Sequence, residues 1–326
     1  MQSRAVWSIL NLLNSNKWGC IMRCSSFLKG DIMADSQKQI VQWFPGHMAK
    51  TRRKIKESLP LIDAVTVLLD ARIPESSKNP ELDDLIEGKP KIFLLNKCDL
   101  ADEKATAEWV AYYKRQGITA LAVDCRSGKG LNQYRDALRR VCSKKLKAYE
   151  ERGMSGKALR VMVVGIPNTG KSSFINRLTG NGKARVEDRA GVTRHNQWFV
   201  AGGGIELLDT PGVLWPKFED KSVGDKLAFT GGIKDNILDI ETLSMRFLSI
   251  LAHQYPDKLA ARYKMTELEG LDDYELLCLL GKKRGMLISG GEVDTERAAI
   301  MLFDEFRGGK LGRLTLELPP TEENNG

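Results

Sequence analysis

The stretch Gly165-Ile166-Pro167-Asn168-Thr169-Gly170-Lys171-Ser172 decides how this chain folds, because it matches the phosphate-loop pattern GxxxxGK[ST]. It follows an apolar run at residues 160–164 and opens a helical pattern, which is the strand-to-helix context that the motif needs. Backbone N–H groups of such a loop surround phosphates, while the lysine reaches the β and γ oxygens and the serine hydroxyl binds Mg²⁺. The candidate nucleotide-binding residues here are Asn168, Thr169, Gly170, Lys171, Ser172 and Ser173.

Short apolar runs on both sides of this loop predict the strands of a sheet. With 160–164, they are 64–70 (AVTVLLD), 91–95 (KIFLL), 118–123 (ITALAV) and 205–209 (IELLD). Residues 105–116 and 131–147 have helical periodicity, and one face of the second helix carries Leu131, Tyr134, Leu138 and Val141. Strands that alternate with helices predict an α/β fold with a doubly wound, mostly parallel sheet.

A second motif, Asn96-Lys97-Cys98-Asp99, closes the strand at 91–95 and matches the guanine-recognition pattern NKxD. A carboxylate at Asp99 accepts hydrogen bonds from guanine N1–H and N2–H₂, and adenine would leave it unpaired. Asn96 is expected to brace the loop and to touch the base. Four residues alone also fit an ordinary polar turn, but beside a phosphate loop they indicate GTP and GDP as the ligands.

A third motif, Asp209-Thr210-Pro211-Gly212, ends the strand at 205–209 and matches DxxG. Asp209 is expected to reach Mg²⁺ through a water, and the Gly212 N–H to face the γ-phosphate. Thr193 lies between this motif and the phosphate loop, where a switch threonine would cap both Mg²⁺ and the γ-phosphate. The alternative for Thr193 is an ordinary loop threonine. The predicted metal ligands are therefore Ser172, Thr193 and Asp209.

The order of the motifs differs from that of a conventional GTPase. There the phosphate loop comes first, followed by the switch threonine, DxxG, NKxD and a loop that supports the base. Here NKCD comes first, and a candidate base-supporting loop with Asp124 and Cys125 follows at 124–128, before the phosphate loop. The order predicts a circular permutation, in which residues 149–159 join the old ends and new ends open after DTPG.

The chain divides into four predicted regions. Residues 1–39 form an N-terminal extension, 40–219 the permuted GTPase domain, 220–318 a small all-helical domain and 319–326 a disordered tail. In the helical domain, Ile240, Leu243, Phe247 and Leu251 share one face. Residues 1–32 lack acids before Asp31, so they are either a transit peptide or an artefact or disordered arm upstream of a start at Met33.

Charge is unevenly distributed. The 326 residues carry a formal net charge of +8, with a pI of about 9.1. Residues 225–326 contain 13 basic and 18 acidic side chains, so the cationic excess lies in residues 1–224 and favours a polyanionic partner. No apolar run reaches the roughly 18 residues of a membrane span. The six scattered cysteines fit a reducing compartment.

Five segments together resemble the YlqF-type circularly permuted GTPases, the ribosome biogenesis GTPase A family. They are WFPGHM (43–48), DARIP (70–74), NKCD (96–99), GIPNTGKS (165–172) and LDTPGVLWP (208–216), and the resemblance covers about residues 40–318. It implies a cytoplasmic GTP hydrolase that binds the large ribosomal subunit late in assembly, with the helical domain on rRNA. We also expect a monomer that binds neither DNA nor membranes. A mitochondrial location follows only if residues 1–32 are a genuine transit peptide.

The trigger of hydrolysis is less clearly marked in the sequence. Val213 follows DTPG, where Ras-like enzymes place a water-orienting glutamine, so slow intrinsic turnover is expected. His47 could hold the attacking water, or it could be a structural histidine at a turn. Asn168 resembles the asparagine that places K⁺ in potassium-stimulated GTPases, and its alternative is an ordinary loop residue. The candidate catalytic residues are His47, Lys171 and Thr193.

Three groups of cations are candidates for RNA contact. They are Lys50–Lys56, the basic positions of the 135–147 helix, and the loop Gly281-Lys282-Lys283-Arg284-Gly285. A solvated face is the alternative, and it is a more serious rival for the 135–147 helix than for Lys50–Lys56. Two other functions stay open: a nucleotide-binding RNA chaperone with negligible catalysis, and a signalling GTPase.

Overall fold

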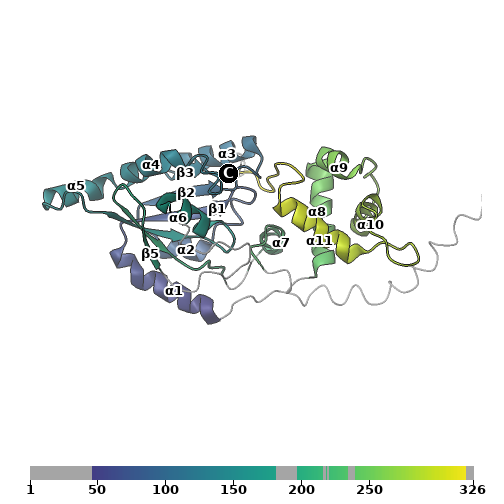
Figure 1. The fold of residues 1–326 in the computed structure, drawn as a ribbon, viewed down its shortest axis with the longest axis horizontal. Coiled ribbons are helices and arrows are strands. Elements are labelled where there is room, and N and C mark those ends of the chain that lie inside the picture. The colour runs from purple at the N-terminus through teal and green to yellow at the C-terminus, as the bar shows by residue number, and fades with distance from the viewer. Residues whose placement is uncertain (1–45, 181–196, 216–217, 219, 234–238, 321–326) are drawn as a thin grey trace, which may run out of the picture. The chain divides into compact units, whose positions relative to one another are not determined.

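The computed structural model describes residues 46–180, 197–215, 218, 220–233 and 239–320 (Figure 1), with side chains from Ala49 onward. All described residues belong to one compact unit. The N-terminal extension, the 321–326 tail, Thr193 and the His47 side chain lie outside the described part of the chain. No described helix is both long enough and apolar enough to cross a bilayer.

One six-stranded sheet organises the first part of the described chain. Its strands are β1 (Ala64–Asp70), β2 (Lys91–Asn96), β3 (Thr119–Ala122), β4 (Leu159–Val164), β5 (Gln197–Val200) and β6 (Ile205–Asp209). They run in the order β3-β2-β1-β4-β6-β5, all parallel except β5, which pairs antiparallel with β6. The predicted α/β fold with a mostly parallel sheet is confirmed. The edge strand β5 was not among the predicted strands.

Each central strand is buried on both faces, and the alternation of its side chains divides the core into two clusters. Ala64 and Leu68 of β1 face a cluster that α4 (Tyr134–Val141) and α6 (Lys171–Thr179) cover. Val65, Val67 and Leu69 of the same strand face a second cluster, which is covered by α1 (Gly46–Ser58), α2 (Pro80–Leu85) and α3 (Glu103–Arg115). Helices on both faces explain why these strands are continuous apolar runs.

The predicted helix at 131–147 is interrupted in the structure. A 3₁₀ turn, η2 (Leu131–Gln133), leads into α4, and α5 (Ser143–Glu151) follows a break at Cys142. Another 3₁₀ turn, η1 (Leu59–Leu61), follows α1. The Tyr134 hydroxyl lies 2.8 Å from Thr66 Oγ1 of β1, which fixes the start of α4 on the sheet.

Helices dominate the described chain after Asp220. They are α7 (Lys221–Phe229), α8 (Ile240–Gln254), α9 (Pro256–Tyr263), α10 (Asp273–Lys283) and α11 (Thr295–Arg307). Aspartates cap the N-termini of four of them, at Asp220, Asp239, Asp272 and Asp294, which places much of the local acidity where the helix dipole favours it. Phe229, Phe247 and Phe303 pack together in their core.

The segment after α11 contacts the loops that follow β1 and β2. Backbone N–H groups of Leu314 and Leu316 donate to the carbonyl oxygens of Leu100 and Arg72, at 3.0 and 2.8 Å. The Tyr255 hydroxyl donates to the Thr315 carbonyl oxygen at 2.7 Å, so the same segment also contacts the residue between α8 and α9. The last residues of the predicted helical region therefore support the loop that follows NKCD.

Candidate functional site

The predicted motifs gather at the carboxyl edge of the sheet. Asp70, Asn96 and Asp209 are the last residues of β1, β2 and β6, and the phosphate loop starts directly after β4. Since these strands are parallel neighbours, their ends lie together. Segments that are far apart in the chain therefore meet around one site.

Close backbone packing explains the glycines of the phosphate loop. A Cβ on Gly165 would lie 2.6 Å from the carbonyl oxygen of Leu68 in β1, and a Cβ on Gly170 would collide with the Asn96 side chain. Gly170 has a left-handed φ of 94° and is the N-cap of α6. The loop thus leads directly into a helix N-terminus, where free backbone N–H groups favour a phosphate.

Lys171 lies inside this loop and is nearly inaccessible to solvent, with 7% of its surface exposed. Its ammonium group donates to the carbonyl oxygens of Ile166 at 2.7 Å and Gly165 at 3.2 Å. Burial lowers the pKa of Lys171 to about 8, against the opposing effect of the Asp209 carboxylate, and the Lys97 charge lowers it further. A negatively charged phosphate would relieve that loss of hydration by pairing with the ammonium.

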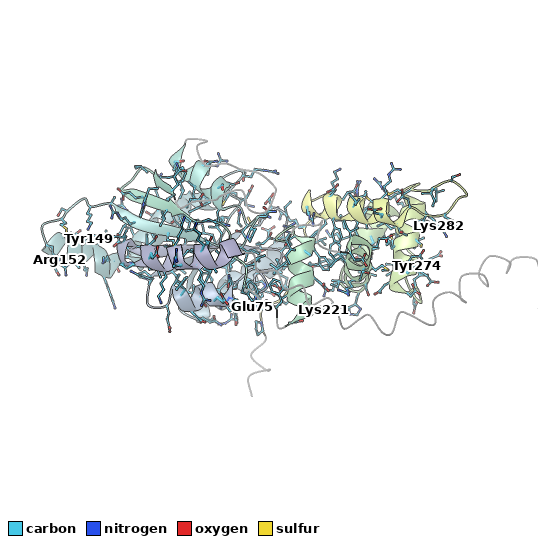
Figure 2. All side chains as sticks on the ribbon, turned by 90° about the horizontal axis from the view of Figure 1, so that it is seen from below. Glu75, Tyr149, Arg152, Lys221, Tyr274 and Lys282 are labelled. Atoms are coloured by element: carbon cyan, nitrogen blue, oxygen red, sulfur yellow. The ribbon has the colours of Figure 1, made fainter. Side chains whose placement is uncertain are left out.

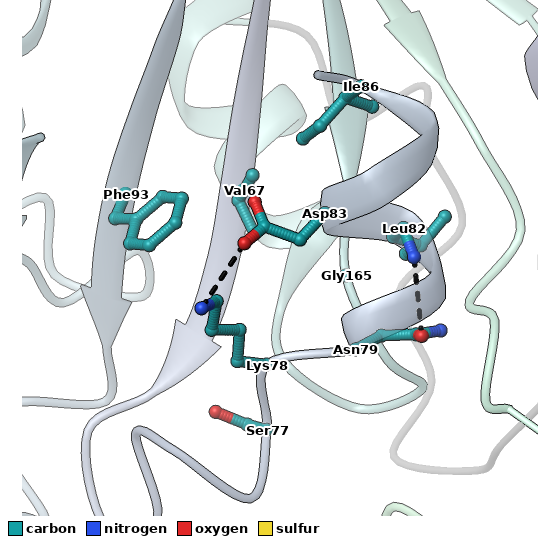
Figure 3. Close-up of a pocket in the computed structure, with 9 residues that line it drawn as sticks. All are labelled: Val67, Ser77, Lys78, Asn79, Leu82, Asp83, Ile86, Phe93 and Gly165. Atoms are coloured by element: carbon teal, nitrogen blue, oxygen red, sulfur yellow. Dashed lines mark hydrogen bonds and ion pairs between the residues drawn. The ribbon is translucent and has the colours of Figure 1, made fainter.

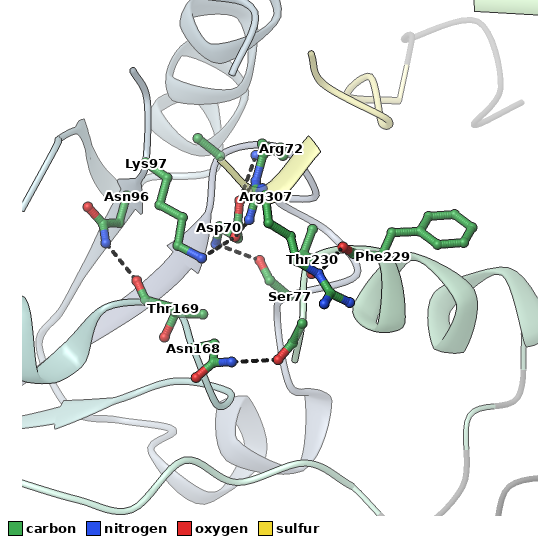
Figure 4. Close-up of polar contacts among 12 residues, drawn as sticks. Asp70, Arg72, Ser77, Asn96, Lys97, Asn168, Thr169, Phe229, Thr230 and Arg307 are labelled. Atoms are coloured by element: carbon green, nitrogen blue, oxygen red, sulfur yellow. Dashed lines mark hydrogen bonds and ion pairs between the residues drawn. The ribbon is translucent and has the colours of Figure 1, made fainter. Parts of the chain in front are cut away.

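Asn96 connects the guanine-recognition motif to two other loops. Its Nδ2 donates to the carbonyl oxygen of Thr169 at 2.6 Å (Figure 4), and its Oδ1 accepts from the backbone N–H of Cys125 at 2.9 Å. The contact to Cys125 is made by its main chain. The hydrogen bond between these loops therefore does not depend on the Cys125 side chain.

The loop at 124–128 is shaped by the Asp124 carboxylate. Its two oxygens accept from the backbone N–H groups of Arg126 at 2.8 Å and Ser127 at 3.2 Å. Burial would raise the pKa of Asp124, but the hydrogen bonds from Ser127 and Arg126 outweigh it, and the pKa lies below its ordinary value. Asp124 thus stabilises the turn of the predicted base-supporting loop by accepting hydrogen bonds from the residues that follow it.

A buried charged cluster next to this site was not predicted from the residues. Arg72 binds Asp70 through two hydrogen bonds, from Nε at 2.9 Å and Nη2 at 2.7 Å, and both residues are almost fully buried. Lys97 Nζ lies 3.1 Å from the Asp70 carboxylate (Figure 4). Burial opposes the charge of Asp70, yet Arg72 and Lys97 hold the pKa of that carboxyl well below its usual range. The sequence signal for this cluster is Asp70 at the end of an apolar run, followed two residues later by Arg72.

The DTPG segment packs directly against the phosphate loop. A Cβ on Gly212 would lie 2.7 Å from the backbone nitrogen of Pro167, so only glycine fits this approach. The Thr210 hydroxyl donates to the Val163 carbonyl oxygen at 2.7 Å and is fully buried. These contacts bring the Gly212 backbone beside the loop that would hold the phosphates.

The Val213 side chain points away from the phosphate loop. It is 3% exposed and belongs to the apolar cluster under α1, α2 and α3, while its backbone N–H donates to the Gly165 carbonyl oxygen at 3.3 Å. Asn79 Nδ2 donates to the Val213 carbonyl oxygen at 3.0 Å. A side chain held in the core cannot orient an attacking water.

Oxygen donors suited to Mg²⁺ lie beside Lys171. Ser172 is in the first turn of α6, and the carboxylate of Asp209 is buried close enough to act on the pKa of Lys171. Hydroxyl and carboxylate oxygens are ligands that Mg²⁺ accepts, and the ion takes its other ligands from waters and phosphates. Within the described residues, no group of three or more His, Cys, Asp or Glu side chains gathers to hold a metal.

Asn168 joins the phosphate loop to the C-terminal end of α7. It has a left-handed φ of 60°, and its Nδ2 donates to the Gly231 carbonyl oxygen at 2.6 Å. Arg307 of α11 donates from Nε and Nη2 to the last carbonyl oxygens of α7, those of Phe229 at 2.9 Å and Ala228 at 2.7 Å. A cation at a helix C-terminus is a favourable cap. Figure 4 labels Asn168, Phe229 and Arg307 at these contacts.

A small cavity near Gly165 does not belong to the nucleotide site. Its lining comes from β1, β2 and α2 and the turn before it (Figure 3), and the Lys78 ammonium lies 3.2 Å from the Asp83 carboxylate at its wall. Of the predicted site segments only Gly165 reaches it. The space suits a water-sized molecule, and a nucleotide cannot enter it.

Comparison with known proteins shows what this arrangement is similar to. Residues 160–265 match a family model described as a 50S ribosome-binding GTPase. A protein of Priestia megaterium named ribosome biogenesis GTPase A is 47% identical over 284 residues, which covers 87% of this chain and 98% of that protein. A GDP-bound YlqF structure aligns with a TM-score of 0.60 at 32% identity, covering 82% of this chain and 99% of the other. A GNP-bound YlqF from Thermotoga maritima aligns with a TM-score of 0.57 at 30% identity, covering 83% and 98%.

Proposed function

The chain belongs to the ribosome biogenesis GTPase A family, and from this membership we propose that it is a GTP-driven switch in late assembly of the large ribosomal subunit. GTP hydrolysis in ribosome biogenesis is the activity of the family. In the proposed cycle the GTP form binds the pre-ribosomal subunit and its rRNA, and hydrolysis releases it. The observation that carries the proposal is the position of the phosphate loop, which Asn96 joins to the guanine-recognition motif and Asn168 joins to α7.

Each loop has a proposed role at the nucleotide. Asp99 reads the guanine edge, Lys171 neutralises the β and γ phosphates, and Ser172 binds Mg²⁺ directly. Asp209 and Thr193 would also help to hold the ion. When bound, Mg²⁺ would neutralise phosphate charge during phosphoryl transfer to water. The Gly212 N–H is proposed to face the γ-phosphate, because its backbone packs on Pro167 of the phosphate loop.

Turnover by the isolated protein is expected to be slow. Val213 lies in the apolar core, so a different group must position the water. We assign this role to His47, which the contact with the ribosomal subunit would bring to the γ-phosphate. Asn168 is proposed to hold K⁺ near the phosphates, where a cation can replace an arginine finger.

Co-sedimentation with ribosomal subunits tests the switch. The full chain should pellet with the large subunit in a non-hydrolysable GTP analogue and stay in the supernatant in GDP. The small subunit serves as the control particle. Equal binding in both nucleotide states would refute the switch.

GTP turnover distinguishes the proposed function from its two rivals. Stimulation by the large subunit supports the assembly switch. An absence of turnover under every condition would instead favour an RNA chaperone with a structural nucleotide. Stimulation by a protein activator or a lipid, without an effect of the subunit, would favour a signalling GTPase.

A further inference from the structure

We infer that the exposed side of α4 and α5, with the turn between β5 and β6, is a binding surface for the phosphate backbone of RNA. The inference rests on the proposed function and adds to it a contact outside the helical region. We call this set of residues the α4–α5 surface. It consists of Arg135, Arg139, Arg140, Lys144, Lys147, Gly202, Gly203 and Gly204, all of which are exposed.

The cations of this surface outnumber the acids of α4 and α5, which are Asp136, Glu150 and Glu151. No acid occurs between Asp136 and Glu150. Within the described residues, none of the five cations forms an ion pair with a carboxylate. In α1 the situation is different, because Arg52 lies 3.1 Å from Glu81 and Arg53 lies 3.5 Å from Glu57. Five cations of α4 and α5 thus have no carboxylate partner among the described residues, against three of the five in α1. We therefore consider α4 and α5 beside Lys50–Lys56 as a site of RNA contact.

The glycine turn extends this surface without side chains that would block a ligand. Arg139 Nη2 donates to the Gly203 carbonyl oxygen at 3.4 Å, and the Arg135 side chain lies within 4 Å of the position of a Cβ on Gly203. Gly203 and Gly204 both have left-handed φ values, of 73° and 75°. The turn requires glycine, and glycine lets a polymer backbone come close to the flanking arginines.

Contacts on the inner side hold α5 in place on the sheet. The Tyr149 hydroxyl donates to Asp63 Oδ1 at 2.5 Å, and Asp63 Oδ2 accepts from the backbone N–H of Arg160 at 3.0 Å. Burial and the Asp63 carboxylate raise the pKa of Tyr149 to about 12, so it remains a donor. Figure 2 shows Tyr149 and Arg152 near the C-terminal end of α5. A fixed helix presents its cations to a ligand with little loss of backbone entropy.

The composition of the surface favours a nucleic acid over a protein or a membrane. Both of these partners usually require large apolar side chains, and α4 and α5 expose none. The exposed large apolar residues of the described chain lie elsewhere: Leu61, Trp198, Val200, Tyr274, Leu287, Ile288, Ile300 and Leu318. Trp198 and Val200 point away from α4, because Phe199 between them packs in the α4 cluster.

The dimensions also fit a phosphate row. The two helices span 134–151, and at roughly 1.5 Å per residue they are about 25 Å long, enough for several consecutive phosphates of one strand. Contacts of this kind are independent of base sequence and sensitive to salt. We therefore assign to this surface a backbone contact that adds affinity without specificity.

The test compares two triple variants of the full chain. One removes three cations from the surface, Arg140→Gln, Lys144→Gln and Lys147→Gln. The control removes three from α3 on the other face of the sheet, Lys104→Gln, Lys114→Gln and Arg115→Gln, so both lose the same charge. Binding is measured to large ribosomal subunits and to an RNA duplex of arbitrary sequence, across a series of KCl concentrations.

The surface variant should lose at least about tenfold in affinity for both ligands near physiological salt. Its plot of log affinity against log salt should be shallower by about 2, since each lost phosphate contact removes roughly 0.7 to 0.9 from the slope. The control should bind like the parent, and basal GTP turnover should be equal in all three proteins. An equal loss of affinity in both variants, or unchanged binding in both, would overturn the proposal that this surface binds RNA.

Two further outcomes separate the surface from the proposed function. Parent protein that binds the duplex but not the subunits would refute the ribosomal role, while the duplex data would still test the surface. The last measurement is binding of the parent and both variants to vesicles that contain about one third phosphatidylserine. Loss of vesicle binding in the surface variant, with duplex and subunit binding unchanged, would assign the surface to a membrane and overturn the proposal.

Discussion

Asn96 Nδ2 lies 2.6 Å from the carbonyl oxygen of Thr169, and this hydrogen bond joins two motifs that are 73 residues apart. The other end of the same amide accepts from the Cys125 N–H. One side chain thus fixes the phosphate loop, the guanine-recognition motif and the base-supporting loop relative to one another. A nucleotide that touches all three needs this spacing to be constant.

Asn96→Ala should therefore weaken nucleotide binding. The substitution leaves the Thr169 carbonyl and the Cys125 N–H without their partner, which costs about 1–3 kcal/mol and corresponds to roughly 5- to 150-fold in affinity for GDP. Equilibrium titration with a fluorescent GDP analogue measures the change. Asn132→Ala, at an exposed position of η2, is the matched control. Equal affinity of the two variants would contradict the bridging role.

Asp70→Asn should destabilise the fold in a pH-dependent way. The variant leaves the buried Arg72 without its carboxylate, and breaking such a pair costs about 3–5 kcal/mol at neutral pH. The folded-state pKa of Asp70 is below its ordinary value of 3.8, so its contribution is complete above that value and is lost as the pH falls further. Urea unfolding at about pH 7 and about pH 3 measures this. A difference between parent and variant that does not shrink at the acidic pH would contradict the assignment.

Val213→Gln should not create a faster enzyme. The side chain at this position points into the apolar cluster, so the glutamine amide would be buried there at a cost of about 1–3 kcal/mol. We expect a lower free energy of unfolding and no increase in intrinsic GTP turnover. Val213→Thr, which buries only a hydroxyl, should lose less stability. A turnover rate that rises with glutamine would show that residue 213 faces the water instead.

Arg307→Gln should affect the nucleotide site through α7. Arg307 holds the carbonyl oxygens of Phe229 and Ala228, and Gly231 just beyond them accepts from Asn168. Without this cap we expect GDP to dissociate several-fold faster, as followed by stopped-flow fluorescence. Arg313→Gln is the control, because Arg313 pairs at the surface with Glu103. Identical dissociation rates in the two variants would limit Arg307 to a structural role within the helical region.

The sequence predicts the central strands well because each is buried on both faces and is therefore a continuous apolar run, as at 64–70 and 160–164. Strand β5 gives no such signal, since Phe199 is its only buried side chain. The break at Cys142 is also hidden, because the apolar residues keep nearly the same helical spacing across it. Short edge strands and helix breaks depend on tertiary packing, and the hydrophobic periodicity of a sequence gives no information about that packing.

At the site, motifs predicted which loops meet, but contacts between loops were not readable from the sequence. The pairing of Lys97 with Asp70 follows from the neighbouring positions of β1 and β2 in the sheet. Likewise, the sequence gives Arg52 no evident partner, and its ion pair with Glu81 exists only because α1 and α2 cover the same face. Such ion pairs can be predicted only when the topology of the fold is known.

The central claim is that the permuted loops form one guanine-nucleotide site, and Asp99→Asn tests it most directly. The variant would present an amide instead of a carboxylate to the base, which removes acceptors for guanine N1–H and N2–H₂ and suits the carbonyl of xanthine. Competition between GDP and xanthosine diphosphate for the full chain gives the preference. We predict that the variant loses its preference for GDP by at least about 100-fold, or about 2.7 kcal/mol. An unchanged preference for GDP would contradict the account.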